Sequence, residues 1–175
     1  MRSTLELLSD YAEYHRDRRN IITHFVGVPM IVLGVSVLLA RLAWPVRGLL
    51  VTPAWAAFTA AALWYLTRGN LTLGAAVSVA MGALVLLAHA LAAGSVAGWL
   101  TWGLGLFVLG WLVQFVGHWY EGRKPAFVDD LAGLLVGPMF VTAEALFAAG
   151  WNRPMQHEIE RRAGPSYIRN MAHPA

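Results

Sequence analysis

Residues 71–93, LTLGAAVSVAMGALVLLAHALAA, carry no Asp, Glu, Lys or Arg side chain. Residues 96–120, VAGWLTWGLGLFVLGWLVQFVGHWY, carry none either. Apolar stretches of roughly 20 residues are long enough for an α-helix to cross the hydrocarbon core of a bilayer. These two adjacent stretches decide the fold class, because they predict an all-α protein that passes through a membrane more than once.

Two further apolar stretches precede them. Residues 26–44 hold a single charge, Arg41, near their end. Residues 51–66 are shorter, and we expect their Trp55, Trp64 and Tyr65 near the membrane interfaces. The composition agrees, since 58% of the 175 residues are hydrophobic and only 13% are charged, against about 45–50% and about 25% in soluble domains. We therefore predict four transmembrane helices.

The positions of Lys and Arg predict the orientation, because positively charged loops stay on the cytoplasmic side. If the four stretches each cross, only Arg41 and Arg47 fall on one side. The other eleven basic residues fall on the side of the N-terminus: Arg2, Arg16, Arg18, Arg19, Arg68, Arg123, Lys124, Arg153, Arg161, Arg162 and Arg169. That side is predicted to be cytoplasmic, in a bacterial inner membrane or, for a eukaryotic chain, in the endoplasmic reticulum.

Residues 127–150 are the exception among the apolar segments. They contain Asp129, Asp130 and Glu144, and a carboxylate in the bilayer centre costs several kcal/mol unless it is paired or hydrated. A fifth crossing would also export the Arg-rich tail. We predict a re-entrant or interfacial hairpin here.

The chain is thus predicted to be one integral membrane domain. Residues 1–25 form an amphipathic helix on the membrane surface, with an N-cap signal at Ser3 and Thr4, residues 26–120 hold the four spans, and residues 151–175 are a polar tail.

Candidate chemistry lies at one membrane face. His15 and His24 precede the first span and His118 and Glu121 end the fourth, so the topology brings both groups to the same side. His15 and His24 are nine residues apart and would face opposite ways on one straight helix. They can share a centre only if the chain turns between them, and residues 17–20 are a plausible place because Asp and Asn favour turns.

The side chains available at this face limit the possible chemistry. The chain has no cysteine, which excludes disulfides and thiolate ligands. Three imidazoles with the carboxylate of Glu121 suit Fe(II), Mn(II) or Zn(II) and leave coordination positions open. His157 lies on the same side as a candidate further ligand. Alternatively, the histidines are polar interface anchors and Glu121 pairs with Arg123 or Lys124 as a solvated ion pair.

Three function classes follow from these observations. They are a metal-dependent oxidative enzyme, a metal-dependent lipid hydrolase in which the ion activates water, and a non-catalytic scaffold or transporter. The basic residues flank hydrophobic spans without forming the continuous patch that phosphate binding uses, so the sequence argues against a nucleic-acid partner. The lipid bilayer is the expected partner, and the sequence leaves the oligomeric state open.

The two histidine-bearing stretches resemble a family of small membrane proteins that contains the fungal endoplasmic-reticulum 2-hydroxy-fatty-acid dioxygenase. The resemblance spans roughly residues 5–150 and rests on a spaced pattern of residues: Tyr14, His15, Asn20, His24, Gly27, Pro29, His118, Glu121, Gly122, Arg123, Pro125 and Ala126. It implies an Fe(II)-dependent α-oxidation in which dioxygen converts a 2-hydroxy fatty acid into the acid one carbon shorter.

The same resemblance implies that His15, His24, His118 and Glu121 hold the metal. Asn20 is then a candidate to hydrogen-bond the substrate or an oxygen species, and Arg123 or Arg19 to hold the substrate carboxylate. A 2-hydroxy acid can chelate a metal while its alkyl chain stays in the bilayer, which suits a site at the interface.

Overall fold

The fold was obtained as a computed structural model, which describes residues 2–128, 130 and 132–171. Apart from one small β-hairpin, the regular elements of this described part are helical, which confirms the all-α class. The helices are α1 (Thr4–Ala12), α2 (Arg18–Ala40), α3 (Pro53–Leu66), α4 (Leu71–Ala92), α5 (Val96–Glu121), the 3-10 turn η1 (Ala126–Val128), α6 (Gly133–Ala148) and α7 (Arg153–Ala163).

Among the residues that the structure describes, three helices are long and apolar enough to cross a membrane: α2, α4 and α5. Large apolar side chains such as Val79 and Leu112 point outward from them, as expected for surfaces that face lipid rather than water. The remaining predicted span, residues 51–66, corresponds to the 14-residue α3, whose length of about 21 Å is short of the roughly 30 Å hydrocarbon core. The count of four crossings therefore stays a prediction.

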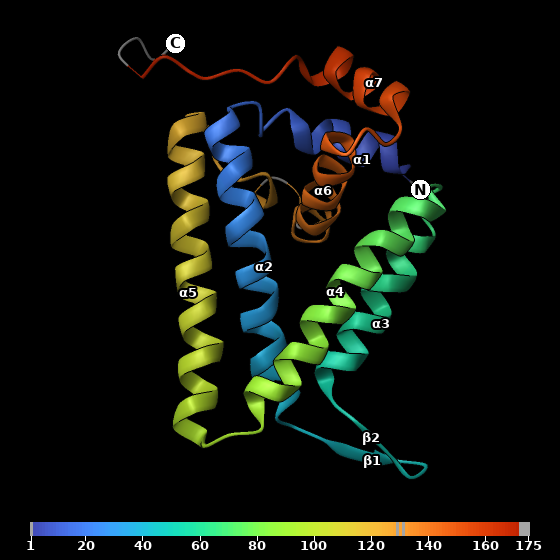
Figure 1. The fold of residues 1–175 in the computed structure, drawn as a ribbon, viewed down its shortest axis with the longest axis vertical. Helices are drawn as coiled ribbons and strands as arrows, with labels where there is room; N and C mark the ends of the chain where they lie inside the picture. The colour runs from blue at the N-terminus through green and yellow to red at the C-terminus, as the bar shows by residue number, and fades with distance from the viewer. Residues whose placement is uncertain (1, 129, 131, 172–175) are drawn as a thin grey trace.

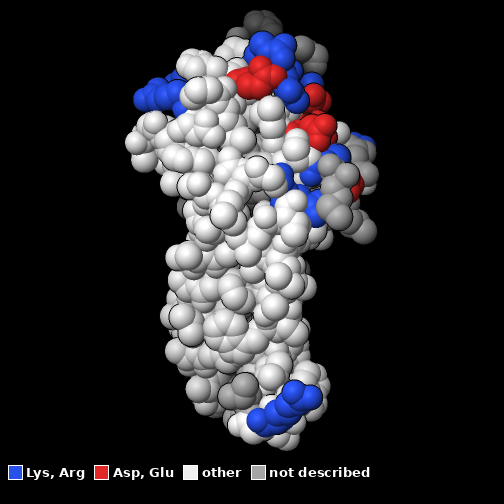
Figure 2. All heavy atoms as spheres, turned by 90° about the vertical axis from the view of Figure 1, so that its right-hand side faces the viewer, with Lys and Arg blue, Asp and Glu red and all other residues white. Residues whose placement is uncertain are grey.

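The charged side chains are concentrated at one end of the molecule. Figure 1 places α1, α7 and the described part of the C-terminal tail at the end where α5 finishes, and the β-hairpin at the opposite end. On the face drawn in Figure 2, acidic and basic side chains gather at the first end, a long uncharged stretch follows, and a basic group lies at the far end. This distribution is that of a membrane protein whose polar end carries the candidate site.

The β-hairpin was not anticipated from the sequence. It pairs β1 (Trp44–Val46) with β2 (Leu49–Val51) in antiparallel register between α2 and α3. Both turn residues, Arg47 and Gly48, have positive φ angles, which is the backbone conformation that two-residue hairpin turns require. The hairpin shortens the third helix and carries one of the two basic residues predicted at this end.

Glycines bring α2 and α5 into close contact. A Cβ at Gly34 would lie 2.6 Å from the backbone nitrogen of Phe107, and one at Gly110 would lie 2.9 Å from the carbonyl of Gly27. Near the polar end, a Cβ at Gly117 would lie 2.5 Å from the amide oxygen of Asn20. Small residues at helix crossings are how membrane helices approach closely. This packing fixes the height of His118 on α5 relative to His24 on α2.

The N-terminal helix is shorter than predicted. Ser3 caps α1 in a reciprocal capping box with Glu6, which confirms the predicted start, but α1 ends at Ala12 and α2 already begins at Arg18. The turn between the histidines therefore covers residues 13–17, before the predicted residues 17–20. The reason is that Asp17 is the N-cap of α2 and accepts a hydrogen bond from the backbone of Arg19.

Within residues 127–150, the predicted hairpin, the described part of the chain contains one α-helix, α6. Figure 1 shows α6 beside the part of α2 nearest the polar end, finishing at the end where α7 begins. Pro138 lies within α6, and residues such as Phe140 and Met139 bury against Leu8 and Tyr11 of α1. The return of α6 to its own end fits a re-entrant path, although the hairpin itself stays a prediction. Asp129, one of the carboxylates that suggested it, lies outside the described residues.

Candidate metal centre

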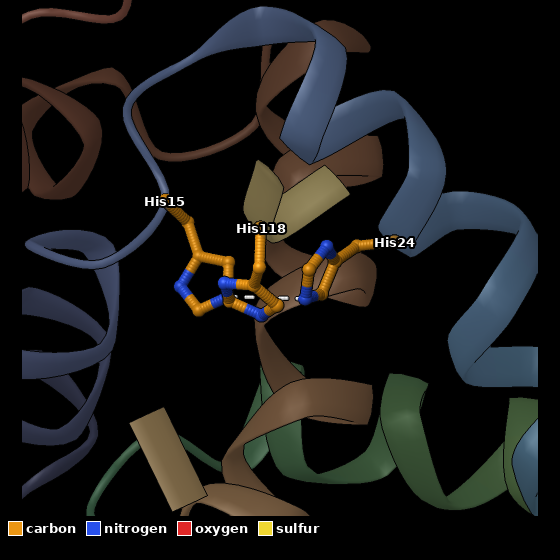
Figure 3. A group of neighbouring side chains, drawn as sticks. All are labelled: His15, His24 and His118. Carbon is orange, nitrogen blue, oxygen red and sulfur yellow. Dashed lines mark hydrogen bonds between the residues drawn. The ribbon is translucent and has the colours of Figure 1, made fainter. Parts of the chain in front are cut away.

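Three histidine rings from distant parts of the chain meet at the polar end. His15 comes from the turn after α1, His24 from the second turn of α2, and His118 from the last turn of α5. Figure 3 shows the three side chains directed toward one another. One ring nitrogen from each lies within 4.8 Å of those of the other two, and all three residues are buried, with exposures of 0%, 2% and 6%. The structure thus brings the histidines of the two predicted stretches together at its polar end.

Backbone carbonyls orient two of the rings. His15 Nδ1 lies 2.6 Å from the carbonyl oxygen of Tyr11, and His24 Nδ1 lies 2.9 Å from that of Asn20. A carbonyl only accepts hydrogen bonds, so each Nδ1 carries the proton and donates. Each Nε2 is then left with its lone pair, which is the form in which imidazole binds a metal.

The two Nε2 atoms of His15 and His24 lie 3.0 Å apart. With both Nδ1 atoms protonated, this contact brings two lone pairs together, which is favourable only if a proton or a cation lies between them. Two nitrogens at about 2.0–2.1 Å from one metal ion and at right angles to each other are about 3 Å apart. His118 adds a third ring, and its Nδ1 has no hydrogen-bond partner among the described residues. The donor set thus fits a divalent transition metal.

The surroundings of His15 keep its ring neutral. Burial, together with the adjacent His24, lowers the pKa of His15 well below its ordinary value. The ring of Tyr11 stacks on that of His15, with centroids 4.0 Å apart and planes within 7°. A ring that is neutral, stacked and bonded at Nδ1 is preorganised as a ligand.

Glu121 holds the turn that carries His15. Its Oε1 accepts a hydrogen bond of 3.0 Å from the backbone of Arg16, and its Oε2 accepts bonds of 2.8 Å from the backbone of Asp17 and 2.9 Å from the Asn20 amide. Glu121 itself is 4% exposed. Because both carboxylate oxygens are engaged with the turn, the structure does not bring Glu121 into the group of three ligand atoms, and its predicted role as a ligand remains a prediction.

The C-terminal tail covers the same turn. Tyr167 exchanges backbone hydrogen bonds with Arg16 and Arg18, of 2.9 and 2.8 Å, and the backbone of Arg169 donates to Asp17 at 2.8 Å. Asp17 also accepts two bonds from the guanidinium of Arg19, so this carboxylate is fully buried among donors. The tail therefore closes the side of the histidine turn that faces away from the helices.

An apolar groove opens beside the histidines. His24, His118 and Tyr11 line one end, and apolar residues of α2, α5 and α6 such as Val28, Ile31 and Leu134 line most of the remainder. The groove holds about 470 Å³ of empty space, which includes space open to the outside. Because its apolar walls lie along two helices long enough to cross a membrane, the groove suits a ligand with an alkyl chain.

The remaining predicted residues have the following positions. Asn20 lies beneath the turn and donates to Glu121 and to the carbonyl of Tyr14, while Arg123 is exposed and donates to the carbonyl of Glu13. Both therefore brace the histidine turn. The side chain of His157 is 74% exposed on α7 and 3.8 Å from Glu160, so the structure gives no support to its prediction as a ligand.

One residue of the groove was not predicted from the sequence. Gln114 is buried in α5, one turn before His118, and lines the groove. The available signal was a lone glutamine inside a 25-residue stretch without charge, a costly place for an amide.

Comparison with known proteins gives two matches. A family model described as 2-hydroxy-palmitic acid dioxygenase Mpo1-like matches residues 1–149, which include all three clustered histidines. The chain is also similar to the 2-hydroxy-palmitic acid dioxygenase MPO1 of Saccharomyces cerevisiae, with 32% identity over 162 residues that cover 87% of each chain. No solved structure matches it. The family match ends before α7 and the tail.

Proposed function

Because the chain belongs to the family described as 2-hydroxy-palmitic acid dioxygenase Mpo1-like, we propose that it is a membrane enzyme that uses dioxygen to shorten 2-hydroxy fatty acids by one carbon. The proposed metal is Fe(II), held by His15, His24 and His118. The observation that carries this proposal is the buried pair of Nε2 lone pairs 3.0 Å apart, beside an apolar groove. Bound there, Fe(II) would supply coordination positions and electrons for the reaction with dioxygen.

The protein contributes position and environment. The carbonyls of Tyr11 and Asn20 fix two rings, and Glu121 fixes the turn from which His15 extends. The groove takes the alkyl chain, which leaves the carboxylate and 2-hydroxyl at the histidine end. Burial of the cluster limits the access of bulk water.

We propose further that α2, α3, α4 and α5 make four crossings, that residues 127–150 re-enter from the polar end, and that this end faces the cytoplasm. The absence of native cysteines makes this testable, since an introduced cysteine is unique. Cysteines at Glu13 and Arg47, at opposite ends, should react with an impermeant maleimide from opposite sides of sealed vesicles. Labelling of both from the same side would contradict the topology.

The enzymatic proposal is tested by metal analysis of the purified protein and by oxygen uptake with 2-hydroxypalmitate after anaerobic loading with ferrous iron. We expect uptake of dioxygen together with formation of the C15 acid. A metal-dependent lipid hydrolase, which three histidines would also suit, would consume no oxygen. Loaded protein that neither consumes oxygen nor forms the shortened acid would contradict the proposal.

A further inference from the structure

The buried side chain of Gln114 has no partner among the described residues. It is 3% exposed, and neither its Nε2 nor its Oε1 has a hydrogen-bond partner. Leaving a buried amide unpaired costs about 1–3 kcal/mol, and most buried polar side chains in proteins are bonded. Gln114 lies inside α5, a helix long and apolar enough to cross a membrane, and this position makes an unpaired amide more costly still.

The surroundings hold this amide next to the metal centre. Gln114 precedes His118 by four residues, so the two project from the same face of α5, and both line the apolar groove with His24. On the opposing helix, a Cβ at Gly27 would lie 2.9 Å from Nε2 of Gln114. Because Gly27 has no side chain, the amide of Gln114 can occupy the space beside it. Gly27 follows His24 by three residues, so this space lies about one helical turn from the histidines.

We propose that Gln114 is a substrate-binding residue that recognises the 2-hydroxy acid head group. This inference rests on the proposed function and names a residue for its specificity. The Nε2 group would donate to the substrate carboxylate and Oε1 would accept from the 2-hydroxyl. A 2-hydroxy acid offers both an acceptor and a donor, whereas an ordinary fatty acid carboxylate offers acceptors only. An amide with both atoms unpaired is therefore complementary to the hydroxylated acid.

The same geometry explains how the head group meets the histidines. With its alkyl chain along the apolar walls formed by Val28, Ile31 and Leu134, a fatty acid would place its polar end between His24, His118 and Gln114. Gln114 thereby selects for the hydroxyl at carbon 2.

The test compares Gln114→Met and Gln114→Leu with the wild type and with Gln156→Met, a control on α7 whose side chain bonds Glu160. Binding of radiolabelled 2-hydroxypalmitate and of palmitate is measured anaerobically in nanodiscs, with metal content and Tm of the ligand-free protein. We expect both Gln114 variants to bind 2-hydroxypalmitate about ten- to a hundredfold more weakly, as loss of a hydrogen bond to a charged group predicts. Palmitate shares the carboxylate but lacks the hydroxyl, so it should lose affinity by a smaller factor, and the preference of the variants for 2-hydroxypalmitate over palmitate should fall.

The stability measurement separates recognition from a structural role. Removing an unpaired buried amide should leave Tm and metal content unchanged or raise Tm. Unchanged affinity for 2-hydroxypalmitate would overturn the inference, as would an affinity loss accompanied by lower Tm and lower metal content in both variants. Oxygen uptake by the wild type distinguishes the two proposals: if it is present while the variants bind normally, the function stands and the role of Gln114 does not.

Discussion

Replacing Glu121 by Gln should destabilise the protein even without metal, because the carboxylate holds the histidine turn directly. In the best orientation, the amide oxygen of Glu121→Gln keeps the two donors now on Oε2, those of Asp17 and Asn20. The new NH2 group then faces the backbone N–H of Arg16, which loses its acceptor. One charge-assisted bond is lost and a buried donor is left unpaired, at a cost of about 2–4 kcal/mol. At roughly 2–4 °C per kcal/mol, Tm should fall by about 5–15 °C.

The assay is the Tm of the metal-free protein in detergent, together with iron content after reconstitution. Glu13→Gln is the matched control, because it removes the same charge from an exposed residue at the start of the same turn. We expect the control to melt within about 1 °C of wild type, since exposed substitutions rarely exceed about 0.5 kcal/mol. A Glu121→Gln protein that melts like wild type when metal-free yet no longer binds iron would refute this reasoning and make Glu121 a ligand.

Three other predictions concern the cluster and the helix packing. Changing any one of the three clustered histidines to Ala should reduce bound iron at least tenfold, as measured by elemental analysis. The control His157→Ala should leave the iron content unchanged. Iron retained in all four variants would exclude the site. Because folding lowers the pKa of His15, the unfolded chain takes up a proton on this ring below about pH 6.5 and the folded chain does not. The metal-free protein should therefore be fully stable above that pH, and its Tm should fall as the pH falls below it. A Tm independent of pH between 5 and 8 would contradict this. Gly34→Ala should lower stability by about 1–3 kcal/mol because its Cβ would press on the backbone of Phe107, whereas Gly105→Ala, where no atom lies within 4 Å, should be neutral or stabilising in the same melting assay.

The membrane fold and the meeting of the histidines could be predicted because both depend on strong constraints. A bilayer demands long uncharged helices, and the order of four such stretches places His15, His24 and His118 at one face without any knowledge of side-chain packing. The same requirement for uncharged membrane helices explains why the basic residues lie at the ends of these stretches. These inferences need only the number and direction of the helices.

The details of the site depend on contacts between residues far apart in the sequence. The turn ends at Asp17 because donors from Arg19 and from Arg169 in the tail converge on its carboxylate. The i, i+3 spacing of His118 and Glu121 correctly suggests one helix face, but the backbone donors of the turn, more than 100 residues earlier, decide what the carboxylate contacts. Spacing alone cannot show such partners, nor can it show that α7 holds His157 outward.

The tail over the histidine turn imposes an order on biosynthesis. His15 leaves the ribosome early, His118 follows after more than a hundred further residues, and Tyr167 and Arg169, which bond the turn, emerge last. Until the tail is synthesised, the turn that carries His15 is held only from the helix side, by Glu121. Glu121 itself is synthesised only three residues after His118. Under the proposed function, metal loading is therefore a late step, and a nascent chain stalled before residue 167 would leave the three histidines without the cover of the tail.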